Sequence, residues 1–278
     1  GDAASDRVEA LLQETAEIRE PAQPTPLPPT SGPRRITFEG VWFRYPGAER
    51  DWVLRDVSFD LPAGKVLGIV GATGSGKTTI AELLLHSYDP DRGRILVDGV
   101  ELRDLALGEL RAAIGMVPQE TFLFSDTLRD NVLLGSPDDG RLDEAARVSR
   151  LDQALPDLPN GWETMLGERG INLSGGQRQR AAIARALVRQ PPVLVLDDAL
   201  SAVDAQTEEE ILHALRDAMV GRTCLIISHR FSAVRDADEI IVLADSTIAE
   251  RGTHAELMAK GGRYVALLSR QELEESLA

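Results

Sequence analysis

A short glycine-rich segment limits what this chain can fold into. Residues 71–78 read GATGSGKT and match the pattern G-x-x-x-x-G-K-[ST]. They follow the apolar run KVLGIV and precede TTIAELLLHSY, which has a helical pattern, and this is the context that the motif requires. The segment predicts a buried strand, a phosphate-binding loop and a helix in succession, which excludes an all-helical or an all-β fold. A glycine-rich turn before an ordinary helix is the alternative.

The chemistry of this loop points to a nucleoside triphosphate. Its glycines let backbone N–H groups face phosphate oxygens, and the following helix adds a partial positive charge at its N-terminus. Lys77 would reach the β and γ phosphates, the Thr78 hydroxyl would bind magnesium, and Asp197, at the end of the apolar strand VLVLD, would hold the magnesium shell. The candidate ATP-binding residues of the loop are Gly71, Ala72, Thr73, Gly74, Ser75, Gly76, Lys77, Thr78 and Thr79.

Strand and helix patterns alternate on both sides of a helical middle region. Strands are expected at RITFEGVWFRY, LRDVSFDL, KVLGIVG, RILVDG, GMVPQ, PVLVLDD, RTCLIIS and EIIVLA, and two helices close the chain. Residues from about 122 to 187 show helical periodicity without a convincing strand. The pattern therefore predicts an α/β domain with a mostly parallel sheet and an inserted helical subdomain.

The first 33 residues differ from the rest. Residues 6–20 have the spacing of a short amphipathic helix, and the proline-rich stretch PAQPTPLPPTSGP follows it. Proline-rich chain is extended and semi-rigid, so we expect residues 1–33 to be a helix and a tether that separates it from a folded domain at residues 34–278.

Composition excludes several classes of protein. Thirty basic against 45 acidic residues give a net charge of −15, which disfavours nucleic acid as a partner. The single cysteine, Cys224, lies in an apolar run and indicates a reduced, intracellular protein. No apolar run approaches the ~20 residues of a membrane-spanning helix, so the isolated domain is expected to be soluble.

The pentapeptide LSGGQ at residues 173–177, followed by QRQRAAIARAL, resembles the signature of ATP-binding-cassette (ABC) proteins. The resemblance extends over residues 36–271. It implies a P-loop NTPase core of the RecA-like kind, an antiparallel β subdomain and the inserted helical subdomain. It also implies ATP and Mg²⁺ as cofactors, and a second ABC domain as partner.

The resemblance assigns a role to residues at several other positions. Tyr45 resembles the aromatic residue that stacks on adenine, and Gln119 resembles the glutamine that senses magnesium and the γ-phosphate. His229 resembles the switch histidine that contacts the γ-phosphate. The residues that would complete the site of a partner domain are Ser174, Gly175, Gly176, Gln177 and Asp204.

Structural explanations also exist for these residues. Tyr45 could be an ordinary aromatic residue of an edge strand, since strands favour tyrosine. His229 by itself could be a packed or surface histidine. Ser174 could cap the helix that runs to Arg189, but a capped helix start with unsatisfied N–H groups is also what would grip a partner's γ-phosphate.

One residue departs from the family pattern. After the strand aspartate the family usually has glutamate as the general base, whereas this chain has Asp198. The aspartate carboxylate falls about 1 Å or more short, and such a misplacement can cost on the order of 10²-fold in rate. With an intact signature, this indicates the degenerate half of a heterodimeric exporter; the alternative is a homodimer with a slow aspartate base.

The stretches ETMLGERG, TLRDNVLLG and ERGTHAELMA resemble exporter sequences. They imply a transmembrane domain in the same full-length chain and a location at the cytoplasmic face of the cell membrane. A soluble ABC ATPase that binds nucleic acid and the separate ATPase subunit of an importer remain as alternatives.

Overall fold

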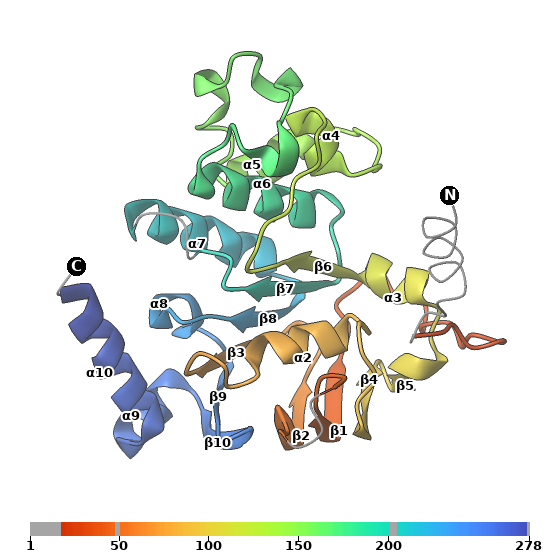
Figure 1. Cartoon of the computed structure of the whole chain (residues 1–278), viewed down its shortest axis with the longest axis vertical. Coiled ribbons are helices and arrows are strands. Elements are labelled where there is room, and N and C mark those ends of the chain that lie inside the picture. Colours follow the sequence, from red (N-terminus) through yellow and green to blue (C-terminus); the bar gives the residue numbers. More distant parts are fainter. Residues whose placement is uncertain (1–17, 48–50, 201–204, 277–278) are drawn as a thin grey trace, which may run out of the picture.

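The computed structural model describes residues 18–47, 51–200 and 205–276, which form two β-sheets with helices around them (Figure 1). The unit expected from the glycine-rich motif is present. Strand β3 (Val66–Gly71) leads through the phosphate loop into helix α2 (Lys77–Leu84). The strand is buried almost throughout because it lies in the interior of its sheet.

The larger sheet has six strands in the order β10-β9-β3-β8-β7-β6. Five of them are parallel: β6 (Ile114–Val117), β7 (Val193–Asp197), β8 (Thr223–Ile227), β3 and β9 (Glu239–Ala244). The register pairs Asp197 with Ile227, so β7 and β8 end side by side. This alignment brings the residues that follow the two strands to one edge of the sheet.

The smaller sheet is antiparallel, with the order β2-β1-β4-β5. Its strands are β1 (Ile36–Phe43), β2 (Leu54–Leu61), β4 (Arg92–Val97) and the short β5 (Val100–Glu101), which is followed by a 3₁₀ turn, η1 (Leu102–Asp104). Inward residues of this sheet share one hydrophobic core with α2 and with one face of the parallel strands. Helix α3 (Leu107–Ala113) leads from this region into β6.

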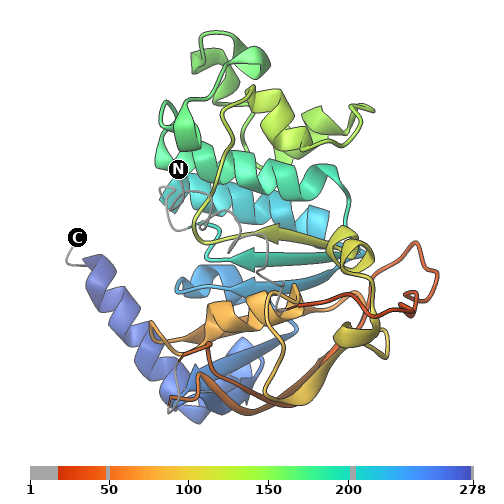
Figure 2. The same cartoon turned by 45° about the vertical axis from the view of Figure 1, so that its right-hand side comes forward.

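The inserted region is helical, as expected. It holds α4 (Leu128–Leu133), α5 (Arg141–Val148), α6 (Gly175–Val188) and the 3₁₀ turns η2 (Leu155–Asp157), η3 (Gly161–Glu163) and η4 (Glu168–Gly170). Both views place α4 and α5 beyond α6, on the side of the molecule opposite the antiparallel sheet (Figure 2). A second core joins α4, α5 and α6 to the other face of the parallel sheet. The predicted fold class is thereby confirmed.

The remaining helices are α7 (Ala205–Met219), α8 (Phe231–Val234), α9 (His254–Lys260) and α10 (Arg263–Ser276). Helix α7 connects β7 to β8, and α8 connects β8 to β9. Helix α8 packs closely on β3, where a Cβ on Gly68 would lie 2.8 Å from the Val234 Cβ. None of the helices in the described part of the chain is long and apolar enough to cross a membrane.

Two details differ from the sequence expectations. Strand β10 (Thr247–Gly252) pairs with β9 through a turn at Asp245 and Ser246, both with positive φ, and it was missed because its sequence TIAERG is largely polar. The proline-rich segment does not stand apart as a spacer. Leu27 is buried and its N–H donates to Glu109, while the Thr25 N–H donates to the Asp104 carbonyl. Most of the predicted N-terminal helix lies outside the described residues.

Candidate nucleotide-binding site

The phosphate loop needs glycine at two positions for steric reasons. A Cβ on Gly71 would lie 2.5 Å from the Leu243 carbonyl oxygen, and one on Gly76 would lie 2.9 Å from Leu54 Cδ2. Gly76 also has a φ of +96°, which side-chain-bearing residues rarely adopt. Because glycine has no Cβ at these two positions, the backbone can pass close to its neighbours as it turns from β3 into α2.

Lys77 lies inside the loop. Its side chain is buried, and Nζ donates to the carbonyl oxygens of Gly71 at 2.9 Å and Ala72 at 3.0 Å. Burial lowers the pKa of Lys77, whereas the carboxylates of Asp198 and Asp197 act to raise it. The ammonium is thus placed where phosphate oxygens, which are stronger acceptors than carbonyls, can replace its present partners.

Two buried carboxylates end β7. Burial raises the pKa of Asp197 to about 6, the Asp198 charge adds to this effect, and the Thr78 hydrogen bond and Lys77 oppose it. Magnesium prefers oxygen ligands, and the hydroxyl of Thr78 already contacts the carboxylate of Asp197. This donor pair fits magnesium, and Gln119 lines the same cavity.

Asp198 is held at several atoms. Its φ is +48°, its N–H donates to Ile227 O at 2.8 Å, and its carbonyl accepts from Gln179 Nε2 at 3.3 Å. Its Oδ1 accepts from the N–H of His229 at 3.3 Å. Burial and Lys77 lower the pKa of His229, whereas Asp198 acts to raise it.

The structure brings most predicted site residues around one cavity of about 290 Å³. Its lining includes Tyr45, Thr73, Gly74, Gly76, Lys77, Thr78, Thr79, Gln119, Asp197, Asp198 and His229. Ala72 and Ser75 line a neighbouring cavity, and Gly71 lines a further one. Asp204 lies outside the described residues.

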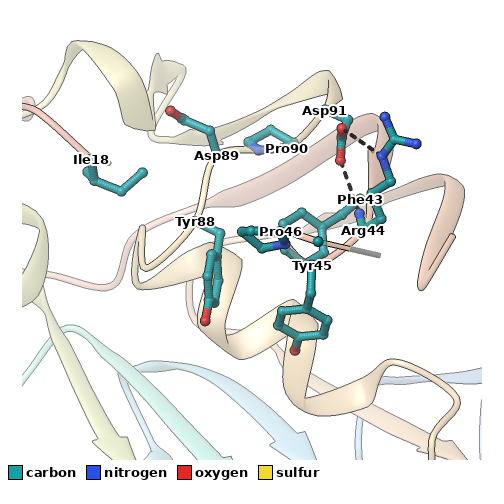
Figure 3. Close-up of a pocket in the computed structure, with 10 residues that line it drawn as sticks. Ile18, Phe43, Arg44, Tyr45, Pro46, Tyr88, Asp89, Pro90 and Asp91 are labelled. Carbon is teal, nitrogen blue, oxygen red and sulfur yellow. Dashed lines mark hydrogen bonds and ion pairs between the residues drawn. The ribbon is translucent and has the colours of Figure 1, made fainter. Parts of the chain in front are cut away.

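Tyr45 follows β1 and forms a wall shared by this cavity and a second one of about 440 Å³. Its ring packs edge-on against Tyr88, and its hydroxyl donates to Glu82 at 2.6 Å and contacts the Thr79 hydroxyl at 2.9 Å. Burial and the bond to Glu82 raise the pKa of Tyr45 to about 12. In the second cavity Ile18 lies across from Tyr88, with Pro46 close to Tyr45 (Figure 3).

The signature residues, 173–177, lie outside the phosphate-loop cavity. Ser174 is exposed and caps α6: its hydroxyl accepts from the Gln177 N–H at 3.1 Å, and the Gln177 side chain accepts from the Ser174 N–H at 2.9 Å. Ser174, Gly175, Gly176 and Gln177 are absent from the residues that line the phosphate-loop cavity.

Two polar residues around the site were missed by the sequence analysis. Gln179 of α6 is buried and contacts Asp198, and Glu208 of α7 is buried against the loop that carries His229. A signal was available for each. Gln179 lies four residues before Ile183, and Glu208 lies four residues before Leu212. Residues four apart share one face of a helix, so both polar side chains lie on a face that is otherwise apolar.

Comparisons with known proteins agree with this geometry. A family model described as "ABC transporter" matches residues 54–201, more than half of the chain. A probable multidrug resistance ABC transporter ATP-binding/permease protein of Bacillus subtilis is 45% identical over 275 residues, which cover 98% of this chain and 46% of that protein. An ATP-dependent lipid A-core flippase of Alkalilimnicola ehrlichii is 46% identical, covering 84% and 40%.

A solved structure of a bacterial Atm1-family ABC exporter with ATP bound superposes with a TM-score of 0.91 at 38% identity, covering 97% of this chain and 47% of that one. The chain spans less than half the length of these relatives. Family match, sequence identity and superposition agree with the phosphate loop, the paired aspartates and the capped signature helix. The chain therefore belongs to the ABC transporter family, as a nucleotide-binding domain of the exporter type.

Proposed function

We propose that this chain binds and hydrolyses ATP to power export by a membrane protein. The observation that carries the proposal is the single cavity in which Lys77, Thr78, Asp197 and His229 meet. A buried ammonium, a hydroxyl–carboxylate pair and an imidazole are groups that can bind the phosphates, the metal ion and the γ-phosphate in phosphoryl transfer. The two relatives described above are named as a multidrug resistance ABC transporter and a lipid A-core flippase, which supports a role in transport.

Each residue would have a defined task. The loop N–H groups and Lys77 bind the phosphates, Thr78 and Asp197 hold Mg²⁺ with Gln119 beside them, and Tyr45 provides an aromatic face for adenine. When bound, the metal ion neutralises charge on the phosphates. His229 holds the γ-phosphate at the end of β8, and Asp198 orients the attacking water as general base.

The position of the signature supports a two-chain site. Ser174, Gly175, Gly176, Gln177 and Asp204 would complete the site of a second nucleotide-binding domain. The N-terminus of α6 offers a positive dipole end and N–H groups for a γ-phosphate that the partner binds. Since Ser174 is exposed and away from the chain's own cavity, a second domain has to supply the phosphate.

Asp198 supports a heterodimer whose two ATP sites hydrolyse ATP at different rates. Its side chain is shorter than glutamate, and its Oδ1 is drawn to the His229 N–H. The chain's own site would therefore hydrolyse ATP slowly, while its signature serves a competent hetero-partner. The other candidate is a homodimer with two slow sites; sedimentation with ATP distinguishes them, because a homodimer forms from this chain alone and a heterodimer requires the partner.

The proposal further places the domain at the cytoplasmic face of the membrane, joined to a transmembrane domain of the same polypeptide. The Bacillus relative is named as an ATP-binding/permease protein, which supports this placement. A soluble ABC ATPase remains the alternative. Membrane fractionation of the protein expressed from its complete gene tests this: recovery in the soluble fraction would contradict the exporter assignment.

The central experiment measures ATP binding and hydrolysis by the purified chain with Mg²⁺, first alone and then with candidate partner domains. We expect binding by the chain alone and hydrolysis that rises when a dimer forms. If the chain binds no ATP, both alone and with partner domains, the proposed function is overturned.

A further inference from the structure

Glu208 is a buried carboxylate for which the proposed catalytic roles give no use. It lies in the first turn of α7 and is 5% exposed. A carboxylate this deeply buried is costly unless charged or hydrogen-bonding partners surround it. The position near a helix N-terminus is electrostatically favourable, but it does not explain why the side chain is directed inward.

Within the part of the chain that the structure describes, the side-chain partners of Glu208 lie just after His229. One carboxylate oxygen forms an ion pair with Arg230, and the other accepts from the Ser232 hydroxyl at 2.6 Å. The carboxylate therefore bridges Arg230, at the end of the loop that leads from β8 into α8, and Ser232, in α8. An ion pair and a hydroxyl bond on two different oxygens fix both the position and the orientation of that loop.

Backbone hydrogen bonds also hold this region. The Ser228 N–H donates to Ile69 O at 3.2 Å, the His229 N–H to Asp198 Oδ1 at 3.3 Å, and the Phe231 N–H to Gln271 Oε1 at 3.1 Å. Glu208 thus supplies a charged contact on the C-terminal side of His229.

We infer that Glu208 is a positioning residue that holds His229 at the γ-phosphate position through Arg230 and Ser232. The inference rests on the proposed role of His229 in ATP binding. Because Glu208 lies in the first turn of α7, the same contact joins the start of this helix to the loop that carries His229. A shift of α7 on dimerisation would then move His229 of the same chain.

The test compares ATP with ADP affinity by calorimetry on this chain, because His229 would contact only the γ-phosphate. The variants are Glu208→Gln, which removes the charge at constant size, and Glu209→Gln, a matched control at the exposed neighbouring position. His229→Ala is the benchmark. We expect His229→Ala to lower the ratio of ATP to ADP affinity by at least about tenfold, the scale of one charge-assisted hydrogen bond.

Glu208→Gln should lower the ratio of ATP to ADP affinity by at least about threefold, with the ADP affinity unchanged. Glu209→Gln should leave the ratio at the wild-type value. Glu208→Asp, which keeps the charge, should restore part of the ratio. An unchanged ratio in a folded Glu208→Gln variant would overturn the inference. If His229→Ala also left the ratio unchanged, the failure would lie in the proposed role of His229 instead.

Thermal unfolding checks that each variant is folded. If Glu208→Gln does not fold, Ser232→Ala replaces it, since that variant removes only the 2.6 Å hydroxyl bond at a more exposed residue. A folded Ser232→Ala variant with a lowered ratio would support the inference, and one with the wild-type ratio would overturn it.

Discussion

The backbone N–H of His229 donates a hydrogen bond of 3.3 Å to the Oδ1 atom of Asp198. The two residues follow neighbouring parallel strands, β8 and β7, whose register aligns their last residues. The bond turns the aspartate carboxylate toward the adjacent strand end. The candidate general base and the candidate γ-phosphate ligand are therefore linked by a direct hydrogen bond.

Asp198→Glu should raise the single-turnover rate of ATP hydrolysis at this chain's site by about 10- to 100-fold, because one more methylene extends the carboxylate toward the attacking water. The measurement uses the dimer with a partner that carries an intact LSGGQ. Asp198→Asn, which matches the size of aspartate and lacks a base, should be slower than the wild type. Wild-type turnover equal to that of the Glu variant would show that aspartate reaches far enough.

Lys77→Ala should weaken Mg-ATP binding by about 10- to 100-fold, because it removes the charge directed at the phosphates. Lys65 offers a matched control, since it is exposed and pairs with Asp238 away from the cavity. Calorimetry should show that Lys65→Ala leaves the affinity unchanged. Equal affinities for the wild type and Lys77→Ala would remove Lys77 from this role.

Tyr45→Ala should weaken ATP and ADP binding alike, by about tenfold, because an aromatic face contacts the base and not the γ-phosphate. Tyr45→Phe keeps the ring and removes the hydroxyl bonds to Glu82 and Thr79. We expect the Phe variant to retain most of the affinity for both nucleotides, measured by calorimetry. A loss confined to ATP would be inconsistent with stacking.

Ser174→Arg should leave this chain's own ATP affinity nearly intact and abolish hydrolysis by the mixed dimer. It also removes a helix cap, which contributes about 1 kcal/mol to stability. Thr253 is a matched control because it forms the same capping box at the start of α9, with Glu256. Thr253→Arg should cost similar stability and leave hydrolysis unchanged; loss of ATP binding in the isolated Ser174→Arg chain would refute the cross-dimer assignment.

Glu250 should contribute stability that depends on pH. Burial acts to raise its pKa, but the N–H groups of Tyr264 at 3.0 Å and Arg263 at 2.8 Å prevail and hold the pKa below the ordinary 4.5. The stabilisation is therefore complete above about pH 5 and is lost as the pH falls below 4.5. Denaturant unfolding at pH 6, 4 and 3 should show a smaller acid loss in Glu250→Gln than in the wild type.

Glu272→Gln provides the comparison for this pH series, since Glu272 is an exposed carboxylate on α10, the helix whose first residues bind Glu250. Its acid loss should match that of the wild type. Parallel pH profiles for Glu250→Gln and the wild type would mean that the two N–H contacts do not stabilise the charged carboxylate.

The amino-acid sequence by itself predicted the elements that local patterns encode. Glycine spacing before Lys77 determined the strand–loop–helix unit, and apolar runs determined the buried parallel strands, because backbone conformation and burial periodicity are properties of neighbouring residues. The capped start of α6 at Ser174 was also predictable, since its two reciprocal bonds join residues three apart in the chain.

Contacts between distant segments were decided by the tertiary structure alone. The bond between His229 and Asp198, the ion pair between Arg230 and Glu208 and the burial of Leu27 each join segments far apart in the chain. Strand β10 forms because β9 offers it a partner. The physical reason is that register and helix packing choose which polar groups meet, and the energy of a buried polar group depends on its partners and not on its neighbours in sequence.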